Sequence, residues 1–182
     1  MLLTQHSDTI WTIANFLSSK ECEDLILFSE MKGYEEATVS LREGARMMKG
    51  IRNNYRLIYQ DEKLATQYWR RLADYCPPKI AANIAIGLNE QFRFYKYEPH
   101  QRFKRHVDGR FRRSEIEESR ITFMIYLNDN FTGGETRFDK ITIKPKIGTA
   151  LCFIHEQKHE GSSVEKGVKY VLRSDVMYRK IS

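Results

Sequence analysis

Apolar residues recur with a period of two throughout the second half of the sequence. This pattern begins after Gln91 and recurs in five short runs: Phe92 and Phe94, Ile121 to Leu127, Ile141 and Ile143, Ala150 to Ile154, and Val168 to Leu172. A period of two is typical of β-strands, whose successive side chains point to opposite faces. Turn residues such as Gly133 and Gly134 separate the runs at short intervals. Residues 91–182 are therefore predicted to form antiparallel strands of a small barrel or jelly roll.

The first 90 residues contain two helical patterns. Ser18 and Glu21 have the spacing of a capping box, in which each side chain accepts a hydrogen bond from the other residue's backbone amide. A second pattern starts at Asp61 and must stop before Pro77, because proline lacks the amide hydrogen and clashes with the preceding turn. We expect residues 1–90 to be mostly helical and to support the strands, which gives a mainly β protein of the α+β class.

Composition limits the class of protein. With 182 residues, of which 41% are hydrophobic, residues 1–182 are long enough for a single domain with a core. No apolar run reaches about 18 residues and the first residues lack the features of a secretory signal, so we expect a cytoplasmic protein that does not enter membranes. The three cysteines are far apart, which favours buried thiols over a zinc motif.

The formal net charge of +6 raises the question of a nucleic-acid partner. A nucleic-acid-binding module should gather its basic residues in an aromatic-lined stripe. Here 30 basic residues are spread along the chain and mixed with 24 acidic ones. A basic binding module without catalysis is therefore a remote alternative.

His106 and Asp108 are separated by one residue. In a strand, both side chains would point to one face while Val107 packs on the other. One histidine from a distant strand would complete a two-histidine, one-carboxylate triad, which occupies three positions of an octahedral Fe(II) and leaves three open for cosubstrate and oxygen. His155 and His159 both compete for this place. The alternative interpretation of His106 is a surface histidine in a basic segment.

Lys169 belongs to a predicted strand in which it shares a face with Val171, Arg173 and Asp175. A buried cation needs an anionic partner. A dicarboxylate such as 2-oxoglutarate would supply one, since it could chelate iron through its keto-acid end and pair its far carboxylate with Lys169. Arg173 is the competing anchor, with the better bidentate geometry.

Three blocks of the sequence closely resemble the iron- and 2-oxoglutarate-dependent dioxygenases, in particular the prolyl 4-hydroxylase-like branch. The blocks are Arg93–Pro99 with Phe103–Gly109, Arg120–Asn128 with Gly133–Phe138, and His159–Lys169. The resemblance runs across most of the chain, and the order and spacing of the blocks are specific. It implies a double-stranded β-helix, the jelly-roll or cupin-like fold, with supporting N-terminal helices.

The same resemblance implies that His106, Asp108 and His159 hold iron, and it prefers Lys169 to Arg173 as the anchor of 2-oxoglutarate. His155 is then expected in a loop or directly behind the metal ligands.

Other positions near the expected site have two interpretations. Tyr97 and Tyr126 fall where the family contacts 2-oxoglutarate through aromatic rings or hydroxyl groups, with core packing as the alternative for both. His100 stands where many relatives have glycine, and we expect it to face solvent. The segment Arg110–Glu118 is predicted to be a loop, either a substrate lid or a solvated connection.

The implied activity is that of a dioxygenase that uses Fe(II), 2-oxoglutarate and O2, with ascorbate as a further candidate cofactor. Such an enzyme hydroxylates a C–H bond and decarboxylates 2-oxoglutarate to succinate and CO2. Because Asp108 supplies a carboxylate ligand, no iron position is reserved for halide, which favours hydroxylation over halogenation. The expected substrate is a prolyl residue in a peptide or protein, and the alternative is a free amino acid or another small molecule.

Overall fold

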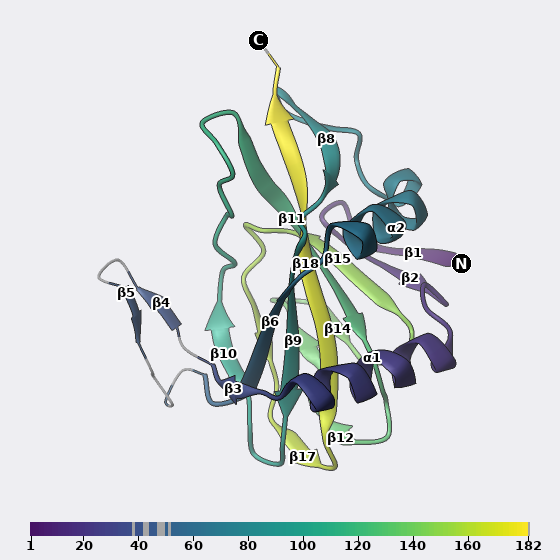
Figure 1. Ribbon diagram of the computed structural model, residues 1–182, viewed down its shortest axis with the longest axis vertical. Helices are drawn as coiled ribbons and strands as arrows, with labels where there is room; N and C mark the ends of the chain where they lie inside the picture. The colour runs from purple at the N-terminus through teal and green to yellow at the C-terminus, as the bar shows by residue number, and fades with distance from the viewer. Residues whose placement is uncertain (38, 42–43, 47–49, 51, 182) are drawn as a thin grey trace.

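The computed structural model describes residues 1–37, 39–41, 44–46, 50 and 52–181. A sheet of ten strands forms its centre, and the pairings within this sheet are antiparallel. Eight strands follow one path: β1 (Leu2–Ser7), β2 (Ile10–Ala14), β15 (Ala150–Ile154), β11 (Glu117–Tyr126), β18 (Lys169–Lys180), β9 (Gln91–Tyr97), β6 (Tyr55–Gln60) and β3 (Glu35–Glu36). The other two strands are β8 (Asn83–Leu88), which lies beside β18 (Figure 1), and β7 (Lys79–Ile80), which pairs with β8.

A second, smaller sheet packs against one face of the large sheet. Its order is β10 (Phe103–His106), β16 (His159–Gly161), β13 (Thr136–Arg137) and β14 (Thr142–Ile143). Two short pairs complete the strands: β12 (Thr132–Gly133) with β17 (Val164–Lys166), and β4 (Val39–Leu41) with β5 (Gly44–Arg46). Two antiparallel sheets packed face to face form the predicted jelly roll, so the expected fold class is confirmed.

The helical elements are α1 (Ser19–Lys32), α2 (Glu62–Leu72) and the 3-10 turn η1 (Ala73–Tyr75). The capping box at the start of α1 is present, because Ser18 Oγ accepts from the Glu21 amide at 3.2 Å and Glu21 accepts from the Ser18 amide at 2.8 Å. Asp61 caps α2 by accepting from the Leu64 amide at 2.9 Å. Both predicted helices are confirmed. Neither they nor the other described residues form a helix long and apolar enough to span a membrane.

The expectation that residues 1–90 are mostly helical is wrong. Strands β1, β2, β6 and β8 lie in this part of the chain, and three of them pair with strands of the second half. In β2, the residues from Ile10 to Ile13 are all buried, so the strand appears as a continuous apolar run without alternation. Such a short run cannot be distinguished from a piece of buried helix by its period.

Alternation along the central strands divides the core into two layers. The two helices lie over one face of the large sheet (Figure 1). This face buries Phe92, Phe94, Phe123 and Leu172. The opposite face carries Tyr95, Tyr97, Tyr126 and Val171 toward the smaller sheet. Because Lys169 and Arg173 have the same strand parity as Val171, they also point between the two sheets. The polar site is therefore built on the face that the helices do not cover.

Candidate metal centre

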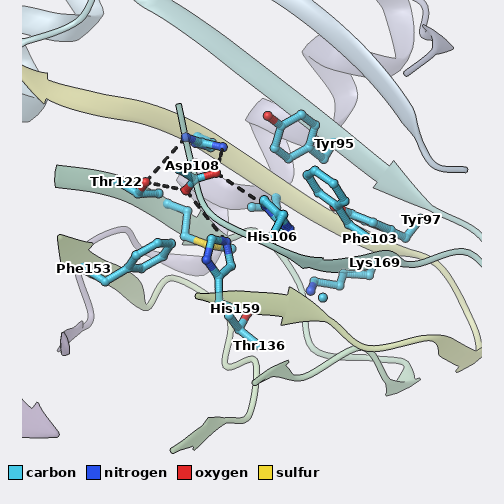
Figure 2. Close-up of a pocket in the computed structure, with 14 residues that line it drawn as sticks. Tyr95, Tyr97, Phe103, His106, Asp108, Thr122, Thr136, Phe153, His159 and Lys169 are labelled. Atoms are coloured by element: carbon cyan, nitrogen blue, oxygen red, sulfur yellow. Dashed lines mark hydrogen bonds and ion pairs between the residues drawn. The ribbon is translucent and has the colours of Figure 1, made fainter. Parts of the chain in front are cut away.

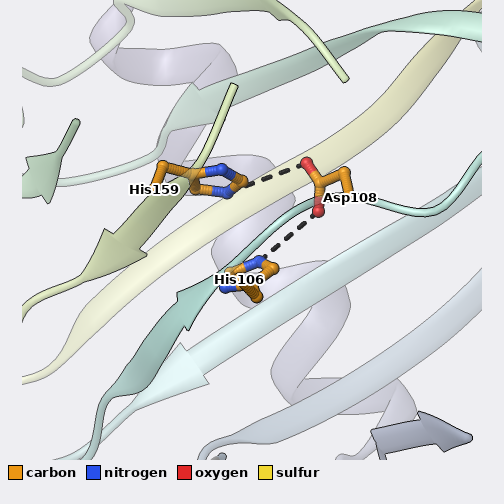
Figure 3. A group of neighbouring side chains, drawn as sticks. All are labelled: His106, Asp108 and His159. Carbon is orange, nitrogen blue, oxygen red and sulfur yellow. Dashed lines mark ion pairs between the residues drawn. The ribbon is translucent and has the colours of Figure 1, made fainter. Parts of the chain in front are cut away.

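His106, Asp108 and His159 come together between the two sheets (Figure 3). His106 ends β10 and His159 begins β16, and the two residues are paired in the register of these strands. One ligand atom from each of the three side chains lies within 4.8 Å of the others. Asp108 lies just beyond β10 rather than in the strand, and Val107 is 52% exposed because β10 is the edge of its sheet. The expectation that Val107 packs on the opposite side is therefore wrong, although the histidine and the carboxylate still converge.

Both imidazole rings are oriented by backbone carbonyl groups. His106 Nδ1 donates to the Lys104 carbonyl at 2.7 Å, and His159 Nδ1 donates to the Gln157 carbonyl at 2.9 Å. The Nε2 atoms consequently face Asp108, at 3.5 Å from His106 to Oδ1 and 3.7 Å from His159 to Oδ2. Metal-binding histidines generally donate their second ring nitrogen to such an acceptor, which fixes the tautomer. The donor set and its orientation fit an Fe(II) ion.

The protonation states also suit a metal. Burial by itself would raise the pKa of Asp108, but the Arg173 guanidinium and the two histidines hold this pKa well below its usual range. Burial lowers the pKa of His159 to about 4, against the opposing effect of Asp108. At neutral pH the site therefore offers a carboxylate and a neutral imidazole without the need to remove a proton from either group.

Arg173 lies beside Asp108. Its Nη1 atom donates to Asp108 Oδ1 at 2.8 Å, and its Nη2 atom donates to Asp175 Oδ1 at 3.1 Å. Both terminal nitrogens of this guanidinium are thus engaged with buried carboxylates. The second oxygen of Asp108 accepts from the Thr122 hydroxyl at 2.6 Å.

Lys169 lies at the other end of the pocket, near Tyr97 and Thr136 (Figure 2). Only 3% of it is exposed, and its Nζ atom donates to the Gly134 carbonyl at 2.7 Å. The rings of Tyr97 and Tyr126 flank the ammonium group, with their centroids 5.3 and 5.5 Å away. Within the described ranges, no carboxylate forms an ion pair with Lys169 at up to 4.0 Å. Burial lowers the pKa of Lys169 to about 8, although the more distant Glu135 acts in the opposite direction.

The two predicted tyrosines differ in their surroundings. Tyr97 lines the pocket, and burial raises its pKa to about 12, so its hydroxyl stays protonated. Tyr126 is fully buried, and its hydroxyl is hydrogen-bonded to Thr136 Oγ1 at 2.7 Å. Tyr126 therefore reaches the site through Thr136, which itself lines the pocket.

Sequence reasoning missed the apolar walls of the pocket. The Phe103 ring stacks on His106 with 3.6 Å between centroids, and the Phe153 ring lies 4.5 Å from His159. Phe153 could have been found, because it is a large apolar residue within the predicted strand Ala150 to Ile154 and points to the face opposite Cys152 and Ile154. Phe103 gave no such signal, since a register irregularity between Phe103 and His106 brings both side chains to one side.

The remaining histidines lie where they were expected. His155 is in the turn after β15, with only 1% of it exposed, and it contacts Thr122 behind Asp108. His100 is exposed and has a φ of 69°, in the left-handed region that glycine adopts without strain.

The arginines of the Arg110–Glu118 segment pair with acidic residues of the same chain. Arg110 contacts Glu118 at 3.0 Å, and Arg113 contacts Glu90 at 2.5 Å. These arginines are therefore neutralised within the chain.

Comparison with known proteins agrees with this geometry. Residues 92–174, which include the three candidate ligands and Lys169, match the model of the 2OG-Fe(II) oxygenase superfamily. Residues 92–174 thus match a 2OG-Fe(II) oxygenase domain, and the resemblance found in the sequence is confirmed. Fe(II), 2-oxoglutarate and O2 are the cofactor and cosubstrates of this family.

Several individual relatives are named as prolyl hydroxylases. A putative prolyl 4-hydroxylase of Acanthamoeba polyphaga mimivirus is 23% identical over 193 residues, which cover 94% of this chain and 75% of the relative. The viral collagen prolyl hydroxylase of Paramecium Bursaria Chlorella virus-1, solved with 2-oxoglutarate, has a TM-score of 0.65 and 21% identity. The match covers 95% of this chain and 97% of the viral chain. A Trichoplax adhaerens prolyl hydroxylase, solved with a hypoxia-inducible-factor peptide, has a TM-score of 0.70 and 17% identity. The match covers 93% of this chain and 84% of the Trichoplax chain. At these identities the solved structures establish the fold.

Proposed function

We propose that His106, Asp108 and His159 hold Fe(II), and that the chain hydroxylates a prolyl residue in a peptide or protein with 2-oxoglutarate and O2. The observation that carries the proposal is the combination of three ligand atoms within 4.8 Å and a buried lysine in one pocket. Three protein ligands leave three positions of an octahedral ion open. A structural metal site would instead be closed by its ligands.

Lys169 is the proposed anchor for the far carboxylate of 2-oxoglutarate. A buried cation without a carboxylate partner among the described residues is complementary to an anionic ligand. Arg173 remains the second choice, because its guanidinium is already bonded to Asp108 and Asp175. The tyrosine rings beside Lys169 limit the movement of its side chain, and the Tyr126–Thr136 hydroxyl pair offers a further hydrogen bond to the ligand.

The chain's own residues position the reactants and keep water away. When bound, iron and 2-oxoglutarate supply the oxidising chemistry, with succinate and CO2 as products. Phe103 and Phe153 pack against the histidines, and Met124 adds an apolar side chain to the same wall. Such a wall lets an apolar C–H group approach while water is excluded from the site.

The relatives' names support prolyl hydroxylation over the alternative of a free amino acid or small molecule. Ascorbate as an additional cofactor and a cytoplasmic location stay predictions.

The test is to incubate the purified chain with Fe(II) and 2-oxoglutarate and to measure succinate. Proline-containing peptides, the same peptides with alanine in place of proline, and free amino acids are then screened for the mass of one added oxygen atom. We expect the mass of one added oxygen atom to appear in the proline-containing peptides and not in the alanine peptides or the free amino acids. Hydroxylation of free amino acids without peptide products would favour the alternative substrate, and a complete lack of succinate would contradict the proposed activity.

The pKa of Lys169 predicts how 2-oxoglutarate binding depends on pH. Because burial lowers this pKa to about 8, the ammonium form that pairs with a carboxylate is lost from the ligand-free protein above that pH. Binding must then take up a proton, so the affinity should fall up to about tenfold for each pH unit above 8. Equilibrium dialysis with the Mn(II)-loaded protein from pH 7 to 9.5 would measure this. The Lys169→Arg variant, which keeps its charge, should show a flat profile, and an equal slope in both proteins would contradict the prediction.

A further inference from the structure

A chain of hydrogen bonds runs behind Asp108 through residues that the proposed activity has not used. Ser119 and Thr122 lie in β11, and His155 lies in the turn after β15. His155 Nε2 is 2.8 Å from Ser119 Oγ, and His155 Nδ1 is 3.0 Å from Thr122 Oγ1. Thr122 Oγ1 in turn is 2.6 Å from Asp108 Oδ2. The three residues behind Asp108 are each no more than 1% exposed, so water does not substitute for these contacts.

The direction of each hydrogen bond follows from the number of protons available. Thr122 has one hydroxyl hydrogen and donates it to the Asp108 carboxylate, so it can only accept from His155 Nδ1. Nδ1 of His155 therefore carries a hydrogen. In a neutral ring Nε2 is then an acceptor and receives the Ser119 hydroxyl hydrogen, while Ser119 Oγ accepts from the Phe111 amide at 2.8 Å. Arg173 Nη2 also donates to Thr122 Oγ1, at 3.4 Å, so the oxygen of Thr122 accepts from two donors while its one hydrogen points to Asp108. The chain from Ser119 thus has a single direction toward Asp108.

The neutral state of His155 agrees with its surroundings. The charged groups around it are Asp175, whose Oδ1 is 4.0 Å from Nε2, together with Arg173, Asp108 and Glu156. Burial lowers the pKa of His155, and Arg173 adds to this effect while the three carboxylates oppose it. The ring can thus serve as donor on one nitrogen and acceptor on the other.

The carboxylate of Asp108 is held on both oxygens. Arg173 donates to Oδ1 and Thr122 donates to Oδ2, so each oxygen keeps one further lone pair for another partner. Without the Thr122 hydroxyl, Arg173 alone would hold the carboxylate, and Oδ2 would lose its donor. The Thr122 contact therefore holds the oxygen that faces His159, and together with Arg173 it limits rotation of the carboxylate about the bond to its β-carbon.

We propose that Thr122 and His155 are positioning residues for Asp108, in which His155 fixes the Thr122 hydroxyl as a donor and Thr122 fixes the orientation of the carboxylate toward the metal. This inference rests on the proposed role of Asp108 as an iron ligand. His155 acts only through Thr122, since no contact joins His155 directly to the three candidate ligands in the part of the chain that is described. Residues that orient metal ligands in this way typically contribute about 10- to 100-fold to metal affinity.

The test measures Mn(II) affinity without 2-oxoglutarate, by electron paramagnetic resonance, on variants whose circular dichroism matches the wild type. Thr122→Val keeps the shape of the side chain without the hydroxyl, and His155→Phe keeps a ring without its nitrogens. Each should weaken Mn(II) binding about tenfold or more. Thr122→Ser, which keeps the hydroxyl, and His155→Asn, whose amide can replace the Nδ1 donor, should recover most of the affinity.

A double variant separates positioning from a general effect on packing. Because His155 acts through Thr122, Thr122→Val combined with His155→Phe should bind Mn(II) as weakly as Thr122→Val alone. Losses that multiply in the double variant, or single variants with wild-type affinity, would overturn the inference. If Thr122→Val does not fold, Ser119→Ala tests the same chain from its far end, and unchanged Mn(II) affinity would again overturn it. A wild-type protein that fails to bind Mn(II) would instead contradict the proposed function.

Discussion

The His159→Ala variant should lose metal binding and succinate production. The substitution removes one of the three proposed ligand atoms, in a site where His159 is only 6% exposed and where His106 is the one other histidine of the group among the described residues. Changes behind the ligands of a metal site typically cost about 10- to 100-fold in affinity, and the loss of a ligand itself should exceed that range. Mn(II) titration and a succinate assay at saturating iron would measure both effects.

Two histidines serve as controls for this variant. His100→Ala removes an exposed histidine outside the pocket and should leave Mn(II) binding unchanged. His155→Asn should still produce succinate at saturating iron, because His155 touches Thr122 and not the metal ligands. Succinate production that survived in His159→Ala and disappeared in His155→Asn would reverse the ligand assignment.

The Lys169→Ala variant should bind 2-oxoglutarate about 100-fold more weakly or worse. Removal of one partner from a buried ion pair costs about 3–5 kcal/mol, and about 1.4 kcal/mol corresponds to a factor of ten. Mn(II) affinity should change little, because Lys169 lies at the end of the pocket away from Asp108 (Figure 2). Calorimetric titration of 2-oxoglutarate into the Mn(II)-loaded protein would measure the loss.

Lys166→Ala is the matched control, since this lysine is exposed on β17 and only three residues away. Arg173→Ala should weaken 2-oxoglutarate binding less than Lys169→Ala, because Arg173 is bonded to Asp108 and Asp175. Equal losses in the two variants, or a larger loss for Arg173→Ala, would contradict the choice of Lys169 as anchor.

The sequence predicted the parts of the molecule that depend on local patterns. Strand parity places Lys169, Val171 and Arg173 on one face, and the structure has them there. The helix starts at Ser18 and Asp61 were predicted because a cap is defined by a few neighbouring residues. The three candidate ligands were predicted from their spacing within the resembling blocks, and they do lie together.

The parts that escaped prediction depend on contacts between distant segments. The link between Thr122 and His155 arises from the register of β11 on β15, in which Thr122 is opposite Phe153. The position of Phe103 depends on the irregular pairing of β10 with β16. Strand β2 was missed because its burial on both faces removes alternation from its sequence. None of these features has a signature within a single short window.

The buried charge of Lys169 has a consequence for how long the protein survives in a cell. Because the pKa is lowered from 10.5 to about 8, keeping this lysine protonated below pH 8 lowers the free energy of unfolding of the ligand-free protein by about 3 kcal/mol. A ligand that binds only the folded chain stabilises it in proportion to the logarithm of its concentration. When 2-oxoglutarate is scarce, a larger fraction of the chain should therefore be unfolded and open to proteases. We expect the abundance of this protein to follow the supply of its cosubstrate.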